Sequence, residues 1–298
     1  MGERYLIINA DDLGMSDSTN AAIGELFREK RITSSTLMAP CPKVGEAMDM
    51  LRENKYPVGV HLTLTSDWKS EGWPSIAPAS TVPSLLDENG WLWDTKRLSK
   101  HGKSSHVSVE LEAQMRLMQE AGCKIDHADS HSGTLYGING RLFFINAFRF
   151  CRKYRLPFRF PKSSRFLKEQ IGGKVPGVLY AAHRMIVMWA TIMGVDLIDD
   201  MITNPDPVKT IKSYENLKDY YLRQVTECRE GITELFLHPA LPDEKLSRMT
   251  PEWEKRVMEY RFLLNDDLLM LLERENIKPV SWGEAPFKRQ MERRRDNG

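Results

Sequence analysis

Short apolar runs alternate with amphipathic segments along most of this chain of 298 residues, and that alternation restricts its fold more than any other feature. Residues 5–10 form one such run, and Ala22, Leu26 and Phe27 follow it at helical spacing. Further strands are expected at residues 32–39, 58–64, 125–128, 157–160, 233–237 and 279–282, and one long helix at 252–273. Strands that alternate with helices are typical of a parallel sheet. About seven such units predict an α/β fold, a distorted TIM-like (β/α) barrel, as one domain over residues 1–298.

Two stretches interrupt this alternation, at about residues 66–106 and 162–212. The first is rich in Ser, Pro and Gly and is too long for an ordinary connection. It also carries Trp68, Trp73, Trp91 and Trp93, and disordered segments rarely contain so many tryptophans. Their rings either stack on a sugar or only hold the loop in place. The second stretch contains an apolar helix at residues 178–193, which is too short to span a membrane and is expected to pack internally or in a homodimer.

The charges of the chain almost cancel, with 42 basic and 41 acidic residues and a formal net charge of +1. Such a balance provides no long-range field that would recruit nucleic acid or an anionic membrane. The sequence enters a strand pattern at once, without a charged and then apolar leader, and no run approaches the ~20 apolar residues of a membrane span. We therefore expect a cytoplasmic protein that has neither nucleic acid nor a membrane as a partner.

Carboxylate and imidazole side chains gather at the ends of four strand-like runs. These ends are Asn9-Ala10-Asp11-Asp12, Gly59-Val60-His61, Asp126-His127-Ala128-Asp129-Ser130-His131 and Leu237-His238-Pro239. In a β/α barrel such ends meet on one face, where catalytic groups lie. Adjacent carboxylates together with imidazoles can supply three ligands to a divalent ion and still leave an acid and a base. The pattern therefore predicts a metal-dependent hydrolase, although adjacency alone does not assign the roles of Asp11 and Asp12.

The same motifs, in this order and at this spacing, resemble the YdjC-like family of carbohydrate deacetylases, typified by chitooligosaccharide deacetylase. The matching segments are Asn-Ala-Asp-Asp-Leu-Gly from residue 9, Gly-Val-His-Leu-Thr-Leu-Thr from residue 59, His-Ala-Asp-Ser-His from residue 127 and Leu-Phe-Leu-His-Pro from residue 235. The C-terminal pattern is also similar, with Trp253, Arg256 and Arg261 on a helix and Ser281-Trp282-Gly283-Glu284 after the last strand. The resemblance covers nearly the whole chain.

This resemblance implies a barrel that holds one divalent metal ion through Asp12, His61 and His131. An Asp/His/His set also leaves coordination positions open for water and substrate, as a catalytic site requires. The ion would be Zn or Mg, with Mn or Co as further candidates. Asp11 would be the general base toward a water that the metal has activated, and His238 the acid that protonates the leaving nitrogen. The substrate would be an N-acetylated amino sugar or a chitooligosaccharide-like small carbohydrate, which loses acetate.

Three further residues near these motifs are expected to support the site or to contact the substrate. Asp129 could orient a ligating imidazole through its second nitrogen. Arg159 could fix a carboxylate such as Asp11, bind substrate, or form only a structural salt bridge. His127 is expected to support a ligand or to touch the substrate rather than to bind the metal itself.

The chain departs from the family pattern directly after His131. A typical member continues with further histidines, whereas this chain has Ser132-Gly133-Thr134-Leu135-Tyr136. Any substrate contact that those histidines make therefore cannot be carried over, while the expected metal ligands are unaffected.

Two other functions remain open on the sequence. The chain could be another metal-dependent barrel hydrolase, of the amidohydrolase or phosphoesterase type, but amidohydrolases usually open with His-x-His where this chain has Asp11-Asp12. It could also be a catalytically idle sugar-binding barrel. An idle site is expected to lose a ligand or the acid, and all of them are present here.

Overall fold

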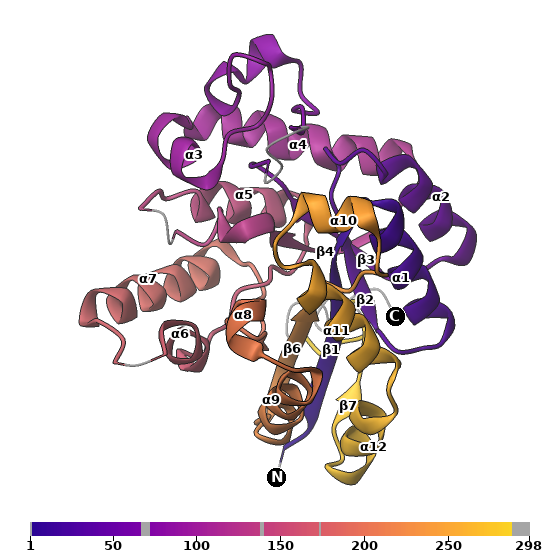
Figure 1. Cartoon of the computed structure of the whole chain (residues 1–298). Helices are drawn as coiled ribbons and strands as arrows, with labels where there is room; N and C mark the ends of the chain where they lie inside the picture. Colours follow the sequence, from indigo (N-terminus) through magenta and orange to yellow (C-terminus); the bar gives the residue numbers. More distant parts are fainter. Residues whose placement is uncertain (1, 67–71, 138–139, 173, 288–298) are drawn as a thin grey trace, which may run out of the picture.

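The computed structural model describes residues 2–66, 72–137, 140–172 and 174–287, and Figure 1 shows their arrangement. The helices and strands follow one another in the order β1 (Arg4–Leu13), α1 (Asp17–Arg28), β2 (Ser34–Leu37), α2 (Val44–Asn54), β3 (Val58–Leu62), α3 (Thr95–His101), α4 (Ser104–Glu120), β4 (Ile125–Ser130), α5 (Phe144–Tyr154), α6 (Arg165–Ile171), α7 (Gly177–Met193), β5 (Asp200–Ile202), α8 (Val208–Ile211), α9 (Tyr214–Thr226), β6 (Gly231–Leu237), α10 (Glu244–Met249), α11 (Trp253–Leu264), α12 (Asp267–Arg274) and β7 (Lys278–Pro279). Short 3-10 helices are η1 (Ala79–Thr81), η2 (Pro83–Leu85) and η3 (His131–Gly133).

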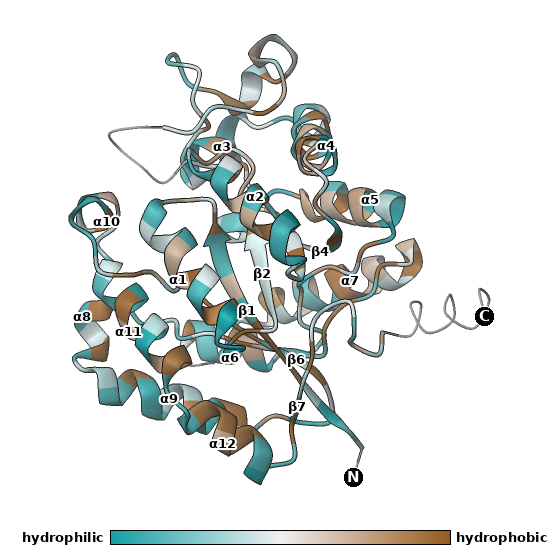
Figure 2. Ribbon diagram, turned by 90° about the vertical axis from the view of Figure 1, so that its right-hand side faces the viewer, coloured by the Kyte–Doolittle hydropathy of each residue, from teal (hydrophilic) through white to brown (hydrophobic). Residues whose placement is uncertain are grey.

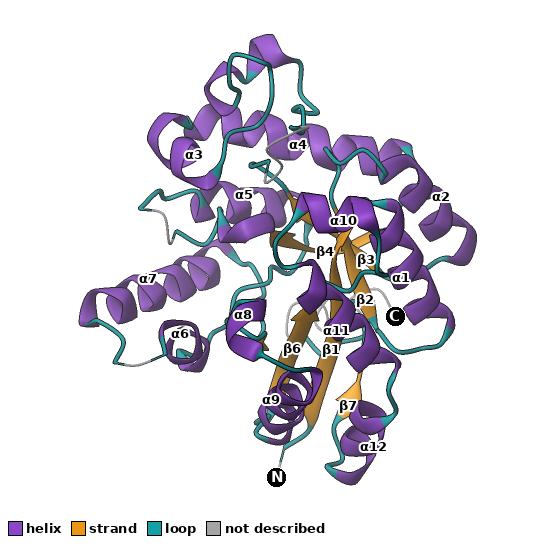
Figure 3. Ribbon diagram, viewed as in Figure 1, coloured by secondary structure: helices purple, strands orange, loops and turns teal. Residues whose placement is uncertain are grey.

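The strands form one curled parallel sheet surrounded by helices, as Figure 3 shows. Their order is β4-β3-β2-β1-β6-β5, and β7 pairs with the start of β1. Phe158 forms bridges to Ala128 and to Leu197, and backbone hydrogen bonds from Lys162 to Ile198 and from Ser163 to Asp199 extend this link, so an irregular segment joins β4 to the residues before β5. The predicted α/β fold with about seven parallel strands is thus confirmed, as a half-barrel with a thin seam at Phe158.

Two predicted elements differ in the structure. The strand expected at residues 157–160 is reduced to the bridges of Phe158. The helix expected at residues 252–273 is divided into α11 and α12, because the side chain of Asn265 accepts a hydrogen bond from the Asp267 amide (2.9 Å). An asparagine that bonds to the backbone in this way favours a new helix start over continuation.

The interior of the barrel changes from apolar to charged along β1. Alternate residues of this strand point away from the interior and pack against the helices, namely Leu6, Ile8 and Ala10. On the other face Ile7 packs beside Trp282, and Asn9 and Asp11 follow it toward the end of the strand. Figure 2 shows the apolar residues of β1 and β6 at the centre of the molecule. The charged groups therefore gather where β1 ends.

The first insertion is fastened to one face of α4. The buried carboxylate of Glu110 accepts hydrogen bonds from the backbone amides of Ile76 and Ala77, each 3.0 Å long. One turn further on, the amide of Gln114 bonds to both backbone groups of Thr63, at the end of β3. Burial raises the pKa of Glu110, and hydrogen bonds from Gln114 and these amides partly oppose that rise. One helix turn thus holds both the insertion and the end of β3.

Replacing Glu110 with alanine is expected to lower the free energy of unfolding by about 2 kcal/mol, because two buried amides lose their acceptor. Urea unfolding measures the loss, and hydrogen exchange at Ile76 and Ala77 locates it. Glu120→Ala, at the exposed end of the same helix, is the control. Equal exchange rates at these two amides in both variants would contradict the anchoring role of Glu110.

The second insertion contains α6, α7, β5 and α8. Helix α7 packs on α5 with one face and exposes apolar side chains on the other, among them Val178 (73% exposed) and Ile192 (64% exposed). Within the described ranges every helix is too short or too polar to cross a bilayer. The homodimer and the cytoplasmic location stay predictions.

Candidate active site

A local distortion at the end of β1 brings two successive carboxylates to one side of the strand. The pairing of β1 with β2 shifts between Ala10 and Leu13, and Asp12 adopts the left-handed region with φ 67°. In a regular strand, neighbouring side chains point to opposite faces. Because the distortion breaks this alternation, Asp11 and Asp12 both line the same cavity of about 200 Å³. Strained backbone of this kind gathers at functional sites.

Three side chains from different parts of the barrel meet in this cavity. The Oδ1 atom of Asp12 lies 3.4 Å from Nε2 of His61 on β3 and 3.5 Å from Nδ1 of His131 in η3. The two imidazole nitrogens are 3.3 Å apart. Asp12 Oδ1 is buried and accepts no hydrogen bond from any described residue. Three buried donor atoms of this kind, close together and facing one another, are the arrangement that a metal ion requires.

The size of this triangle fits a small divalent cation. A tetrahedral site with bonds of ~2.1 Å to oxygen and nitrogen has edges of ~3.4 Å between its ligands. The three observed distances, 3.3 to 3.5 Å, match that edge. Burial would lower the pKa of His61, but Asp129 and Asp12 outweigh this and raise it to about 10. The surroundings therefore stabilise positive charge at this imidazole.

The net charge of the side chains around the two histidines also favours a divalent cation. Among the described side chains, contacts of 3.5 Å or less connect the two histidines to four carboxylates and two guanidiniums, which belong to Asp11, Asp12, Asp129, Glu234, Arg159 and Arg256. With neutral histidines the cluster carries a net charge of −2. Buried charge is costly unless it is balanced, and one divalent ion would balance it.

Arg159 binds the predicted base, Asp11, and two further carboxylates. Its guanidinium donates two hydrogen bonds to Asp11 (2.7 and 2.8 Å) and two to Glu234 (both 2.9 Å), and it forms an ion pair with Asp129 (2.7 Å). Burial alone would raise the pKa of Asp11, but the charge and hydrogen bonds of Arg159 lower it to about 2. Asp11 is therefore an anion throughout the neutral range.

Helix α11 contacts the opposite side of the cavity. Arg256 donates a hydrogen bond to Oδ2 of Asp12 (2.6 Å), which leaves Oδ1 facing the two histidines. Three residues further along the helix, the Glu259 carboxylate accepts a hydrogen bond from the backbone amide of His238 (2.7 Å). Nε2 of His238 lies 3.9 Å from Oδ2 of Asp11. Loss of solvation lowers the pKa of His238, although Asp12 and Asp11 oppose this.

Of the two remaining polar residues predicted near the site, Asp129 contacts a predicted ligand, whereas His127 does not line the cavity. Asp129 accepts a hydrogen bond from Nδ1 of His61 (2.7 Å), which turns Nε2 toward Asp12. His127 is not among the described residues that line the cavity. Its ring stacks on Trp282 with centroids 4.5 Å apart, and its Nδ1 lies 2.6 Å from Asp126. His127 therefore belongs to the packed interior below the site.

The tryptophans of the first insertion separate into two places. Trp73 is buried, with its ring 5.6 Å from that of His131. Trp91 and Trp93 line another cleft, of about 570 Å³, and Trp93 also packs against Arg97 and His101. Trp68 lies outside the described residues. Of the four, only Trp73 is placed beside the predicted metal ligands in the part of the chain that the structure describes.

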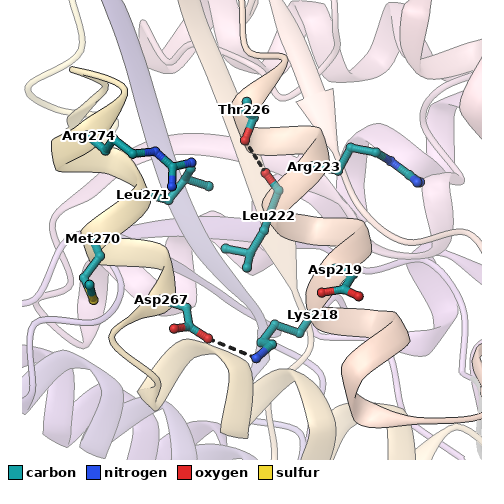
Figure 4. Close-up of a pocket in the computed structure, with 9 residues that line it drawn as sticks. All are labelled: Lys218, Asp219, Leu222, Arg223, Thr226, Asp267, Met270, Leu271 and Arg274. Atoms are coloured by element: carbon teal, nitrogen blue, oxygen red, sulfur yellow. Dashed lines mark hydrogen bonds and ion pairs between the residues drawn. The ribbon is translucent and has the colours of Figure 1, made fainter.

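A further cleft lies between α9 and α12 and is shown in Figure 4. Its volume is about 360 Å³, and charged side chains line it. Lys218 pairs with Asp267 across the cleft (3.2 Å) and with Glu215 (3.1 Å). None of the residues predicted for hydrolysis lies there, so the cavity at the end of β1 is the candidate active site.

Three residues of this site were not assigned a role from the sequence. They are Glu234, Arg256 and Glu259, and all three contact a predicted catalytic or ligating residue or its partner. Glu234 carries a signal that could have found it, because it is a carboxylate inside the apolar strand Gly231–Leu237. Arg256 belongs to the C-terminal pattern that resembles the family, which singled it out without giving it a role, whereas nothing in the sequence of this helix marks out Glu259.

Comparisons with known proteins agree on one family. A family model described as YdjC-like protein matches residues 5–274. A carbohydrate deacetylase of Enterococcus faecalis is 28% identical over 285 residues, which cover 93% of this chain and 96% of that protein. A chitooligosaccharide deacetylase of Proteus mirabilis is 35% identical over 132 residues, 42% of this chain and 48% of that protein. A crystal structure from Enterococcus faecalis, provisionally described as a cellobiose-phosphate cleavage protein, has a TM-score of 0.76 at 27% identity, covering 94% of this chain and 98% of that one.

Proposed function

The chain belongs to the YdjC-like family of carbohydrate deacetylases, and we propose that it hydrolyses the N-acetyl group of an N-acetylated amino sugar or a chitooligosaccharide-like substrate. One observation carries the proposal: the ligand-like triangle of Asp12, His61 and His131 lies in one cavity with Asp11 and His238. Hydrolysis of an amide needs a base for water and an acid for the amine. The two extra residues fit those roles.

Asp12, His61 and His131 would hold one divalent ion, through Oδ1, Nε2 and Nδ1. When bound, the ion supplies Lewis acidity toward the carbonyl oxygen and lowers the pKa of water. Two imidazoles and one carboxylate suit Zn, Mn or Co better than Mg, which prefers oxygen ligands. We propose zinc, because the edges of the triangle fit four ligands at zinc-like distances.

Asp11 is the base in this proposal. Its carboxylate accepts a proton from the attacking water while the water oxygen bonds to the acetamido carbon. Arg159 keeps Asp11 ionised and fixes both of its oxygens. His238 then donates a proton to the nitrogen as the C–N bond breaks. The products are acetate and a free amino sugar.

Three observations support deacetylation over the rival functions. The His-x-His expected of an amidohydrolase is absent from the end of β1, where Asp11 and Asp12 stand. The buried Asp/His/His group is complete among the described residues, whereas an idle sugar-binding barrel would be free to lose it. Two matched relatives described as deacetylases act on carbohydrates by name, and one of them on chitooligosaccharides.

Metal-loaded protein is expected to release acetate from N-acetylglucosamine oligomers, and His238→Gln to lower kcat by ~10²-fold or more because the leaving nitrogen loses its acid. Acetate assay and metal analysis measure both, since His238→Gln should keep its metal. His106→Gln, in the first insertion outside the cavity, is the control. No acetate with any of Zn, Mn, Co or Mg, on oligomers of several lengths, would contradict the proposed function.

A further inference from the structure

The segment in which this chain departs from the family pattern lines the candidate active site. Three residues of the cavity come from it, namely Ser132, Gly133 and Tyr136, and Ser130 and His131 directly before it line the cavity as well. The backbone turns sharply here, since Ser132 has φ 50° and the Tyr136 amide bonds to the carbonyl of Gly133 (2.9 Å). This turn places Tyr136 in the lining of the cavity, in a segment where a typical relative is expected to have histidines.

The ring of Tyr136 packs against two phenylalanines on either side of Arg159. Its edge contacts Phe158 and Phe160, with ring centroids 5.9 and 5.6 Å apart. Arg159, which holds Asp11, stands between these two phenylalanines in the chain. One three-residue segment therefore fixes both the predicted base and the tyrosine ring.

The hydroxyl of Tyr136 forms no hydrogen bond with the described part of the chain. Four other tyrosine hydroxyls are paired, Tyr154 with Glu112, Tyr220 with the Thr203 carbonyl, Tyr221 with Glu259 and Tyr260 with Glu25, whereas that of Tyr214 is also without a partner among the described residues. Burial raises the pKa of Tyr136 well above its ordinary value, and carboxylates nearby add to this while Arg159 opposes it. The group is thus an uncharged donor at every working pH.

Other donors of the cavity are partly committed. Arg159 bonds to Asp11 and Glu234, and Arg256 bonds to Asp12 through Nη2, while Nη1 of Arg256 has no hydrogen-bond partner among the described residues. The Ser130 hydroxyl donates a hydrogen bond to the His131 carbonyl (3.4 Å) and accepts one from the Leu135 amide (3.0 Å). His238 is required at the leaving nitrogen. Negative charge builds on the carbonyl oxygen when water adds to an amide, and a preorganised donor there accelerates the reaction.

We propose that Tyr136 is a catalytic residue whose hydroxyl donates a hydrogen bond to the oxygen of the substrate's acetamido carbonyl as charge builds on it. This rests on the proposed deacetylase function. It gives a role to the Ser132-Gly133-Thr134-Leu135-Tyr136 segment, in which the chain departs from the family pattern.

Tyr136→Phe tests this assignment because it removes the hydroxyl and keeps the ring that packs on Phe158 and Phe160. We expect kcat for acetate release from an N-acetylglucosamine oligomer to fall by ~10²-fold, with KM, metal content and Tm close to wild type. A hydroxyl with only a structural role would not change kcat selectively. Tyr56→Phe is the matched control, since Tyr56 stacks on Phe27 away from the cavity.

The outcomes separate this assignment from the proposed function. Equal kcat in Tyr136→Phe and wild type would overturn the role of Tyr136 and leave the deacetylase function intact. A raised KM with unchanged kcat would also overturn it, because the contact would then exist in the ground state alone. Absence of acetate from wild type, Tyr56→Phe and Tyr136→Phe alike would instead overturn the deacetylase function, and the role of Tyr136 with it.

Discussion

Asp12→Asn is expected to reduce bound metal from about one ion per chain to a small fraction, and kcat for acetate release by ~10³-fold or more. The substitution keeps the shape of the side chain and removes its charge, and asparagine tolerates the left-handed backbone at this position. It leaves two imidazoles without the carboxylate that completes the triangle. His131→Ala should have the same effect by removing a nitrogen ligand. Elemental analysis after dialysis and an acetate assay measure the two losses.

Asp49→Asn is the control for this experiment, because Asp49 is an exposed carboxylate on α2 that pairs only with Arg52 among the described residues. Its metal content and activity should equal those of wild type. Wild-type metal content in either Asp12→Asn or His131→Ala would show that the ligand assignment is wrong.

Arg159→Met is expected to lower the free energy of unfolding by about 3–5 kcal/mol and to abolish activity. The substitution leaves Asp11, Asp129 and Glu234 buried without their shared cation. Removing one partner of a buried ion pair costs more than replacing the whole group, since the remaining charge has no compensation. Urea unfolding of the metal-free protein measures the effect without interference from metal binding.

A second substitution separates stability from catalysis at this group. Glu234→Met removes one of the stranded carboxylates, so Arg159→Met with Glu234→Met should recover part of the lost stability. Activity should not return, because Asp11 remains without Arg159. If the double variant is no more stable than Arg159→Met alone, stranded charge is not the cause of the loss.

Both the barrel and the close approach of the four motifs at its strand ends could be predicted from the sequence, because both depend on local patterns. Alternation along a strand decides the face of each side chain, and parallel strands bring their ends together. Asp12, His61 and His131 accordingly lie within 3.5 Å of one another. Their roles as ligands, and those of Asp11 and His238, stay predictions.

The sequence could not predict contacts that depend on distant packing. Arg256 reaches Asp12 from 244 positions away, through the placement of α11 over the end of the barrel. The backbones of Trp73 and Leu92 are paired (2.8 Å), yet the Trp73 ring lies beside His131 while Trp91 and Trp93 line another cleft, a difference that no pattern within the insertion reveals. His127 shares the motif of Asp129 and His131, yet its contact with Trp282 comes from the far end of the chain.

The thin seam at Phe158 has a consequence for how this protein can vary. Among the described residues no regular strand joins the sheet edges there, and the neighbouring residue, Arg159, connects β1, β4 and β6 through the buried carboxylates of Asp11, Asp129 and Glu234. The Arg159 guanidinium, which keeps Asp11 ionised, thus also holds three strands of the barrel together. Substitutions at Asp11, Asp129, Arg159 and Glu234 should therefore be tolerated only in compensating combinations. A relative that lost the enzymatic activity would need new contacts among β1, β4 and β6 to keep the barrel stable.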